Sequence, residues 1–377
     1  MSTPLYPAAR NFAAQLEDHF PRRAAAEAPC QSAGAPPVDS GAIEAMVDAG
    51  FWASLQREEG YAPEISLAFV PPDRALRPLM FAAALPLGPR ALARLAPAVQ
   101  RPGIHLGVWR EQGQLVVWGT TRAIPSFCFV LEVLGPGLMV VKHRTCEDST
   151  KFQNVAVFEG EQVKVLSPHS VDVSDHPAAL KSLIDPEPSA SPDDPGDVLL
   201  RIAVSMRTHK RGGTLLMVPA EGDAWRESIV RPIAYAVEPP FTELAELVRG
   251  PAAGGASRRD GALGRVVDAI AGLTAVDGAT LITNHYELLA FGVKIGRPDG
   301  RPRVERVELS EPIEGGAAAV VNPLQLGGTR HTSAAQFAQD QPDAVALVAS
   351  QDGRFTIFAW SPRDGLVHAH RVETLLL

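Results

Sequence analysis

The feature that most constrains the fold is the alternation of strand and helix patterns in the second half of the chain. Apolar runs that predict buried strands occur at residues 213–219, 280–283, 288–295, 318–321, 344–349 and 355–360. Helical patterns lie between them at residues 198–206, 263–273 and 325–339. Strands and amphipathic helices of this kind bury their apolar surfaces against each other. The sequence therefore predicts an α/β fold with a mixed central sheet flanked by helices.

A break in composition separates this region from the first half of the chain. Residues 185–197 read DPEPSASPDDPGD, in which proline, serine and acidic residues replace any residue able to build a core. A chain of 377 residues also exceeds the usual size of a single hydrophobic core. We therefore predict a first domain at 1–184, a linker at 185–197 and a second domain at 198–377.

The first domain is predicted to be α+β. Helical spacing of apolar residues occurs at 12–20 and again at 42–56, where Ser40 is the candidate N-cap. From residue 104 the pattern becomes strand-like, with a hairpin around Gly113. Further strands are predicted at 128–134, 138–143 and 155–166.

Charge and composition exclude several classes of function. A net charge of -8 gives no field that would attract a nucleic-acid backbone, so no nucleic-acid partner is expected. The three cysteines are far apart and give no zinc or redox spacing. No secretory leader and no run of about 18 apolar residues is evident. We expect a cytoplasmic protein without a membrane partner.

Asp277, Gly278 and Ala279 form the first segment that could carry chemistry, because they directly precede a predicted strand. Ligands of α/β sheets are usually held at strand ends. Asp277 could coordinate a divalent metal or accept a proton from a ribose hydroxyl, and Gly278 would let a ligand approach the backbone. The alternative is an ordinary turn, in which aspartate before glycine is common.

A second segment has the composition of a phosphate-binding loop. Gly327 and Gly328 would expose backbone amides, and the Arg330 side chain can bind two phosphate oxygens. Thr329 and Thr332 offer hydroxyl groups, and the helix that follows His331 favours an anion at its N-terminus. The alternative is an exposed loop with a capping threonine or serine.

Two other sequence patterns give weaker indications of function. Ser350 to Gly353 lie between two predicted strands and by themselves indicate a hairpin turn. His368 and His370 lie one residue apart in a predicted strand, and the other eight histidines are scattered. This spacing indicates no metal site, so surface or core roles are expected for nearly all the histidines.

Taken in order, these segments resemble the diadenylate cyclase family across about residues 197–360. The family has a Gly-Ala-Leu-Ile-Val strand, an Asp-Gly-Ala motif, a Gly-Thr-Arg-His-Arg loop and a later Ser-Glu. Here the corresponding residues are Gly213 to Val218, Asp277 to Ala279, Gly328 to Thr332, and Ser350 with Gln351. The first half, with residues 107–109, 115–119 and 136–138, resembles the related DACNV group of nucleotide sensors.

The resemblance implies that Asp277 would serve a catalytic Mg or Mn and the attacking ribose hydroxyl. It also implies that Thr329, Arg330 and His331 would hold nucleotide phosphates. Two residues depart from the family pattern: Thr332 replaces an arginine and Gln351 replaces a carboxylate. Because phosphoryl transfer depends mainly on charge neutralisation, these changes should reduce turnover more than binding.

Three hypotheses follow. The first is a sensor that binds an adenine-type or cyclic nucleotide and passes a signal to an output partner not identified by the sequence. The second is an active cyclase that condenses two ATP molecules in a face-to-face homodimer with Mg or Mn. The third is a non-catalytic structural or interaction module. Lys294, Arg297 or a residue from another subunit could compensate for Thr332 and Gln351.

Overall fold

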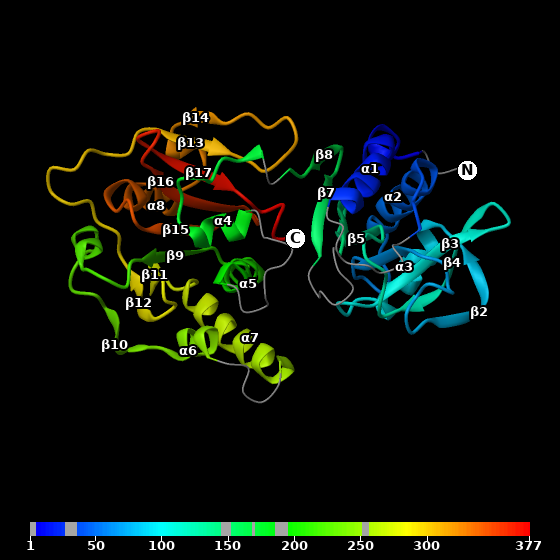
Figure 1. Ribbon diagram of the computed structural model, residues 1–377, viewed down its shortest axis with the longest axis horizontal. Helices are drawn as coiled ribbons and strands as arrows, with labels where there is room; N and C mark the ends of the chain where they lie inside the picture. Colours follow the sequence, from blue (N-terminus) through cyan, green and yellow to red (C-terminus); the bar gives the residue numbers. More distant parts are fainter. Residues whose placement is uncertain (1–4, 27–35, 145–151, 168–169, 185–194, 251–255) are drawn as a thin grey trace. The chain divides into compact units, whose positions relative to one another are not determined.

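The protein consists of two compact units, Met1–Leu166 and Ser167–Leu377. A computed structural model describes residues 5–26, 36–144, 152–167, 170–184, 195–250 and 256–377. Each unit contains one mixed sheet with helices packed against it, shown in Figure 1. The predicted fold class is therefore confirmed.

The first unit contains an eight-stranded sheet in the order β2-β4-β3-β1-β5-β6-β7-β8. Its strands are β1 (Ile65–Phe69), β2 (Leu79–Pro86), β3 (His105–Glu111), β4 (Gln114–Thr121), β5 (Val130–Gly135), β6 (Leu138–His143), β7 (Gln153–Glu159) and β8 (Gln162–Val165). Its helices are α1 (Pro7–Ala26), α2 (Ser40–Ser54), α3 (Pro89–Leu95) and a short 3-10 turn at Ala96–Ala98. Among these strands, β1 and β3 pair in parallel and the other neighbours are antiparallel.

Helix α2 packs on this sheet through a face that includes Ile43, Met46 and Val47, all fully buried. The helix begins after Asp39, whose carboxylate accepts a hydrogen bond of 2.9 Å from the amide of Ala42. The predicted cap, Ser40, is instead the first helical residue. The N-cap prediction is therefore wrong by one residue, because the side chain of Asp39 reaches the free amide.

Close packing explains the glycine and tryptophan pattern of the β3-β4 hairpin. The indole of Trp118 crosses Gly107, and a Cβ atom on that glycine would lie only 2.0 Å from Trp118 Cζ2. Trp118 Nε1 also donates a hydrogen bond of 2.8 Å to the carbonyl of Val70. The glycine is thus required by the tryptophan, and both have a structural role in the hairpin.

We predict that Gly107→Ala destabilises the first unit by about 1 to 3 kcal/mol, because the added methyl group overlaps the indole. Gly135→Ala is the matched control, since no atom lies within 4 Å of a Cβ atom at that strand glycine. Urea denaturation monitored by tryptophan fluorescence measures both. Equal stability of the two variants would contradict the packing argument.

The second unit contains a nine-stranded sheet in the order β10-β12-β11-β9-β15-β16-β17-β13-β14. The strands are β9 (Gly213–Val218), β10 (Tyr235–Phe241), β11 (Ala279–Thr283), β12 (Leu288–Val293), β13 (Val307–Ser310), β14 (Ala319–Val321), β15 (Val345–Ala349), β16 (Phe355–Ser361) and β17 (Leu366–Arg371). The helices are α4 (Ala178–Ile184), α5 (Pro195–Thr208), α6 (Glu243–Arg249), α7 (Ala256–Leu273) and α8 (Thr329–Asp340), with 3-10 turns at Ala224–Ser228 and Pro323–Gln325.

Both faces of this second sheet are covered. Helices α4 to α7 pack on one face, in a core that includes Leu347 and Ile357. Helix α8 packs on the other face with Phe337 against Val348 and Phe358. Such double burial explains why β9, β11 and β15 are buried throughout and largely apolar, without the alternation of a half-exposed strand.

The structure divides the chain after Leu166, whereas the sequence predicted a boundary within 185–197. Leu180, Leu183 and Ile184 of α4 belong to the core of the second unit, although they precede the predicted linker. Residues 185–194 lie outside the described part of the chain, and Pro195 begins α5. The proline-rich composition therefore marks a connection between two helices of one unit.

Among the helices in the described ranges, none is both long enough and apolar enough to cross a lipid bilayer.

Candidate functional site

The segments predicted to bind a nucleotide meet at one edge of the second sheet. Strands β9 and β11 run in parallel, with Leu215 opposite Thr280. Strand β15 runs antiparallel to β9, with Ala349 opposite Gly213. The starts of β9 and β11 therefore lie beside the end of β15. This register brings the turn at Asp277 and the turn at Ser350 to the same edge.

The first turn of α8 lies over the same edge. A Cβ atom on Gly212, just before β9, would be 2.9 Å from Arg330 Nη1 and 3.2 Å from the carbonyl oxygen of Ala349. Gly328 is the N-cap of α8 and supplies no side-chain hydrogen bond to the first turn. A helix N-terminus with free amides attracts anions, so the position of α8 favours a negatively charged ligand.

Asp277 is exposed over 92% of its side chain, and its Oδ2 atom lies 2.6 Å from Lys294 Nζ. The hydrogen bond from Lys294, and then its positive charge, lower the pKa of Asp277 below the ordinary aspartate value. The charge of Arg330 lowers this pKa further. The acidic turn and the glycine-rich turn are therefore within electrostatic range of each other.

The guanidinium of Arg330 forms no hydrogen bond and no ion pair within the described residues. It is half-buried next to the backbone of Gly212. Two other arginines of the unit differ, since Arg207 donates to three backbone carbonyls and Arg371 pairs with Glu311 at 3.0 Å. Arg330 thus retains its donors for an external anion.

Two of the three predicted site glycines are required by packing. Gly278 has φ +117, and a Cβ atom there would lie 2.5 Å from the carbonyl carbon of Gly292. A Cβ atom on Gly327 would lie 2.4 Å from His331 Nδ1. At Gly328 nothing lies within 4 Å of that position. The backbone at Gly328 is therefore the most open to a ligand.

The remaining residues of the predicted loop differ in exposure. His331 is buried against Phe358, and burial lowers its pKa, so the imidazole is a neutral packing group. The hydroxyl of Thr332 is buried without a hydrogen-bond partner among the residues that the structure describes. Thr329 is exposed at the start of α8. Of the three, Thr329 is placed best to reach a phosphate.

Ala279 and Ser350 contribute mainly through backbone structure. Ala279 is buried and begins β11 opposite Val293. Ser350 lies in the hairpin turn predicted between β15 and β16, where its amide donates to the carbonyl of Arg354 at 2.8 Å. Burial acts to raise the pKa of the Asp352 carboxyl. The hydrogen bond from the Ser350 hydroxyl acts in the opposite direction and contributes to a net decrease in this pKa.

The sequence analysis missed two cations at this edge, Lys210 and Arg211, which are exposed in the turn between α5 and β9. Gln351 Nε2 donates a weak hydrogen bond of 3.4 Å to the carbonyl of Arg211, which places this turn beside the β15-β16 turn. The sequence letters KRGG directly before a buried strand were the available signal.

Of the cations proposed to compensate for Thr332, Lys294 is at the edge and Arg297 is not. The charge of Arg297 acts on Asp340, where it partly offsets the increase in pKa caused by burial. Asp340 is the last residue of α8, about 18 Å from its first turn for a helix of this length. Arg297 is thus a suitable control for the charges near Arg330.

The first unit contains a hollow of about 620 Å³ that the sequence analysis also missed. Its lining includes His105, Lys142 and Phe152. His105 is buried and hydrogen-bonded to Ser66 at 2.7 Å, and burial with the nearby charge of Lys142 lowers its pKa to about 4. The hollow therefore has a mainly apolar lining that includes a neutral imidazole, an aromatic ring and a lysine paired with Glu132.

The fold and the two sites define a two-unit α/β protein with a cationic sheet edge. Residues 32–122 match the family described as "Probable sensor domain DACNV", which confirms the resemblance to that group for this segment. The matched segment lies entirely in the first unit and includes α2 and strands β1 to β4. No curated protein matches the chain.

Two solved structures show distant similarity. One is a hypothetical membrane spanning protein from Bacillus cereus, with 14% identity, a TM-score of 0.28 and coverage of 47% of this chain. The match spans 63% of that protein, less than two thirds of its length. The other is a double mutant of DacA from Staphylococcus aureus, with 13% identity, a TM-score of 0.24 and coverage of 46% of this chain and 83% of that one.

We predict that Lys294→Met raises the pKa of Asp277 towards the ordinary value, because it removes both the hydrogen bond and the charge that lower it. Arg330→Met should raise the same pKa by a smaller amount, since its effect is through charge alone. Carbon-detected NMR titration of the Asp277 carboxyl measures both shifts. Arg297→Met is the control and should have no effect. If the pKa of Asp277 were unchanged in Arg330→Met, the acidic turn and the glycine-rich turn would not be within electrostatic range of each other.

Proposed function

We propose that the protein is a nucleotide sensor, in which the cationic edge of the second unit binds a phosphate-bearing nucleotide. The observation that carries this proposal is Arg330, a half-buried guanidinium without an ion pair in the described residues, at the first turn of α8. Arginine can bind two oxygens of a phosphate at once, and the amides of a helix N-terminus add to that attraction.

The charges around this edge favour a polyphosphate or a phosphodiester. Lys210, Arg211 and Lys294 surround the same strand ends as Arg330, while Asp277 is already paired with Lys294. A bound anion would neutralise the positive charges that Asp277 balances only in part. The resemblance to diadenylate cyclases supports adenine as the base and a linear or cyclic nucleotide as the ligand.

The same contacts favour binding over turnover. Asp277 forms an ion pair with Lys294, so a divalent metal would have to displace a cation at 2.6 Å. Gln351 supplies an amide to the carbonyl of Arg211 where the cyclase family has a carboxylate. Phosphoryl transfer depends on metal ions and on cations that neutralise developing charge. The edge therefore has the groups for holding phosphate and few groups for transferring it.

The family match of residues 32–122 supports a sensing role for the first unit. In this proposal the second unit binds the nucleotide, and the first unit receives or transmits the signal to an output partner. The hollow of about 620 Å³ in the first unit is the competing place for a ligand, because it also contains a cation and an aromatic ring. Experiments should therefore test one residue from each unit.

We predict micromolar binding of at least one of ATP, ADP, AMP and cyclic di-AMP to the full chain. Arg330→Ala should weaken it about tenfold or more, because hydrogen bonds from charged groups contribute ~1.5 to 3 kcal/mol. Isothermal titration calorimetry measures the dissociation constants.

Two control variants locate the ligand. Arg297→Ala removes an exposed arginine at the far end of α8 and should leave the affinity unchanged. Arg122→Ala removes an exposed cation that lines the hollow of the first unit. A loss of affinity in Arg122→Ala but not in Arg330→Ala would assign the ligand to the first unit. Absence of binding for all four nucleotides would favour the structural or interaction module.

We predict no conversion of ATP to a cyclic dinucleotide by the full chain with Mg²⁺ or Mn²⁺, because Asp277 is paired and Gln351 has no charge. Chromatography of the nucleotides after incubation measures product. Formation of cyclic di-AMP that disappears in Asp277→Asn would instead establish the active cyclase, with its expected homodimer and catalytic metal.

A further inference from the structure

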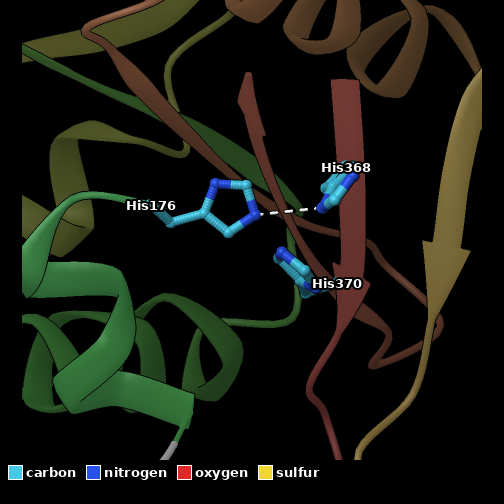
Figure 2. A group of neighbouring side chains, drawn as sticks. All are labelled: His176, His368 and His370. Atoms are coloured by element: carbon cyan, nitrogen blue, oxygen red, sulfur yellow. Dashed lines mark hydrogen bonds between the residues drawn. The ribbon is translucent and has the colours of Figure 1, made fainter. Parts of the chain in front are cut away.

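Three buried histidines of the second unit point toward one another (Figure 2). His368 and His370 project from β17, and His176 lies in the segment that leads into α4. One ring nitrogen from each histidine lies within 4.8 Å of those of the other two. The sequence analysis expected no metal site from these residues, because His176 is 192 positions from His368.

The inward-facing nitrogens have few partners of their own. His176 Nε2 and His368 Nδ1 are 3.1 Å apart, so at most one proton can lie between them. His370 Nε2 is buried and has no hydrogen-bond partner among the described residues. A buried nitrogen without a partner is unusual, because an unmade hydrogen bond is costly. A metal ion between the three rings could accept the lone pairs of all three inward nitrogens.

Among the outward nitrogens, one is hydrogen-bonded to a hydroxyl oxygen, and the other two lie near carboxylates without forming a hydrogen bond among the described residues. His370 Nδ1 lies 2.8 Å from the hydroxyl of Ser310, and His368 Nε2 lies 3.1 Å from Asp364 Oδ2. His176 Nδ1 lies 4.0 Å from Asp175 Oδ1. Metal-binding histidines usually donate their second N–H group to such an oxygen, which fixes the tautomer and turns the other lone pair inward.

Burial also disfavours a positive charge on His176 and His370. His176, His368 and His370 are 4%, 2% and 1% exposed. Burial lowers the pKa of His370 to about 3, with a further decrease from the two other histidines, and burial lowers the pKa of His176 as well. Neutral imidazole is the form that binds a metal ion.

We propose that His176, His368 and His370 bind a transition-metal dication, with Zn²⁺ as the expected ion. Three imidazole nitrogens suit zinc, and tetrahedral zinc at 2.0 to 2.1 Å places its ligands about 3.3 Å apart. His176 Nε2 and His368 Nδ1, at 3.1 Å, already have nearly this spacing. The ring nitrogen of His370 lies within 4.8 Å of both, so a small rotation or shift of this side chain would complete the site. No acidic side chain is needed as a ligand, and a fourth position remains for water.

An ion at this site would cross-link two segments of the fold. His368 and His370 pair with Ala359 and Ile357, which face the core under α4 to α7, whereas α8 and Arg330 belong to the opposite face of the sheet. The metal would fasten the segment before α4 to β17. This role is independent of nucleotide binding at the sheet edge.

Metal analysis of the full chain, purified without a histidine tag and dialysed against metal-free buffer, tests the proposal. We expect close to one zinc per chain by mass spectrometry of the metal. His370→Ala and His176→Ala should each lower this content at least fivefold. His105→Ala is the matched control, since it removes a buried and hydrogen-bonded histidine from the first unit and should leave the zinc content unchanged.

Cobalt substitution identifies the ligands directly. Co²⁺ bound to the wild-type chain should give the visible absorption of a tetrahedral nitrogen-ligated ion, and His370→Ala should lose it. His370→Cys keeps a metal ligand if the alanine variant does not fold, and it should add a sulfur-to-cobalt charge-transfer band in the near ultraviolet. The proposal is overturned if the wild-type chain takes up no zinc or cobalt, or if His370→Cys binds cobalt without that band.

Discussion

The pairing of β9 with both β11 and β15 is the constraint on which the nucleotide hypothesis depends. Because β11 is parallel to β9 and β15 is antiparallel to it, two strand starts and one strand end share an edge. Parallel pairing requires a crossover, and α6 and α7 lie in the connection between β9 and β11. Residues separated by more than a hundred positions thereby reach one small surface.

Packing and binding make different demands on the same glycines. Gly278 and Gly327 are required because a side chain would overlap Gly292 or His331. Gly328 has open space around it and begins α8. A glycine of a predicted binding motif can therefore be required by backbone geometry alone. The same principle applies to Gly107, where Trp118 occupies the space of a side chain.

The two observations that bear on function lie in different units. The family match to a sensor domain covers residues 32–122 of the first unit, and the cationic edge lies in the second. In the proposed function, phosphate would bind to Arg330 and the helix N-terminus, while Asp277 is paired with Lys294. Binding needs fixed positive charge, but phosphoryl transfer also needs a free metal ligand, so binding can outlast catalysis.

Periodicity by itself determined the strands β9, β11 and β15 and the helix α7, because doubly buried strands and amphipathic helices have strong local patterns. It did not reveal β2, whose apolar run is largely exposed, or the unit boundary, because composition records local flexibility and not packing. Tertiary structure alone decided that Lys294 pairs with Asp277 and that His176 joins His368 and His370. Side-chain contacts across long sequence separations depend on strand register and crossover paths, which leave no local pattern.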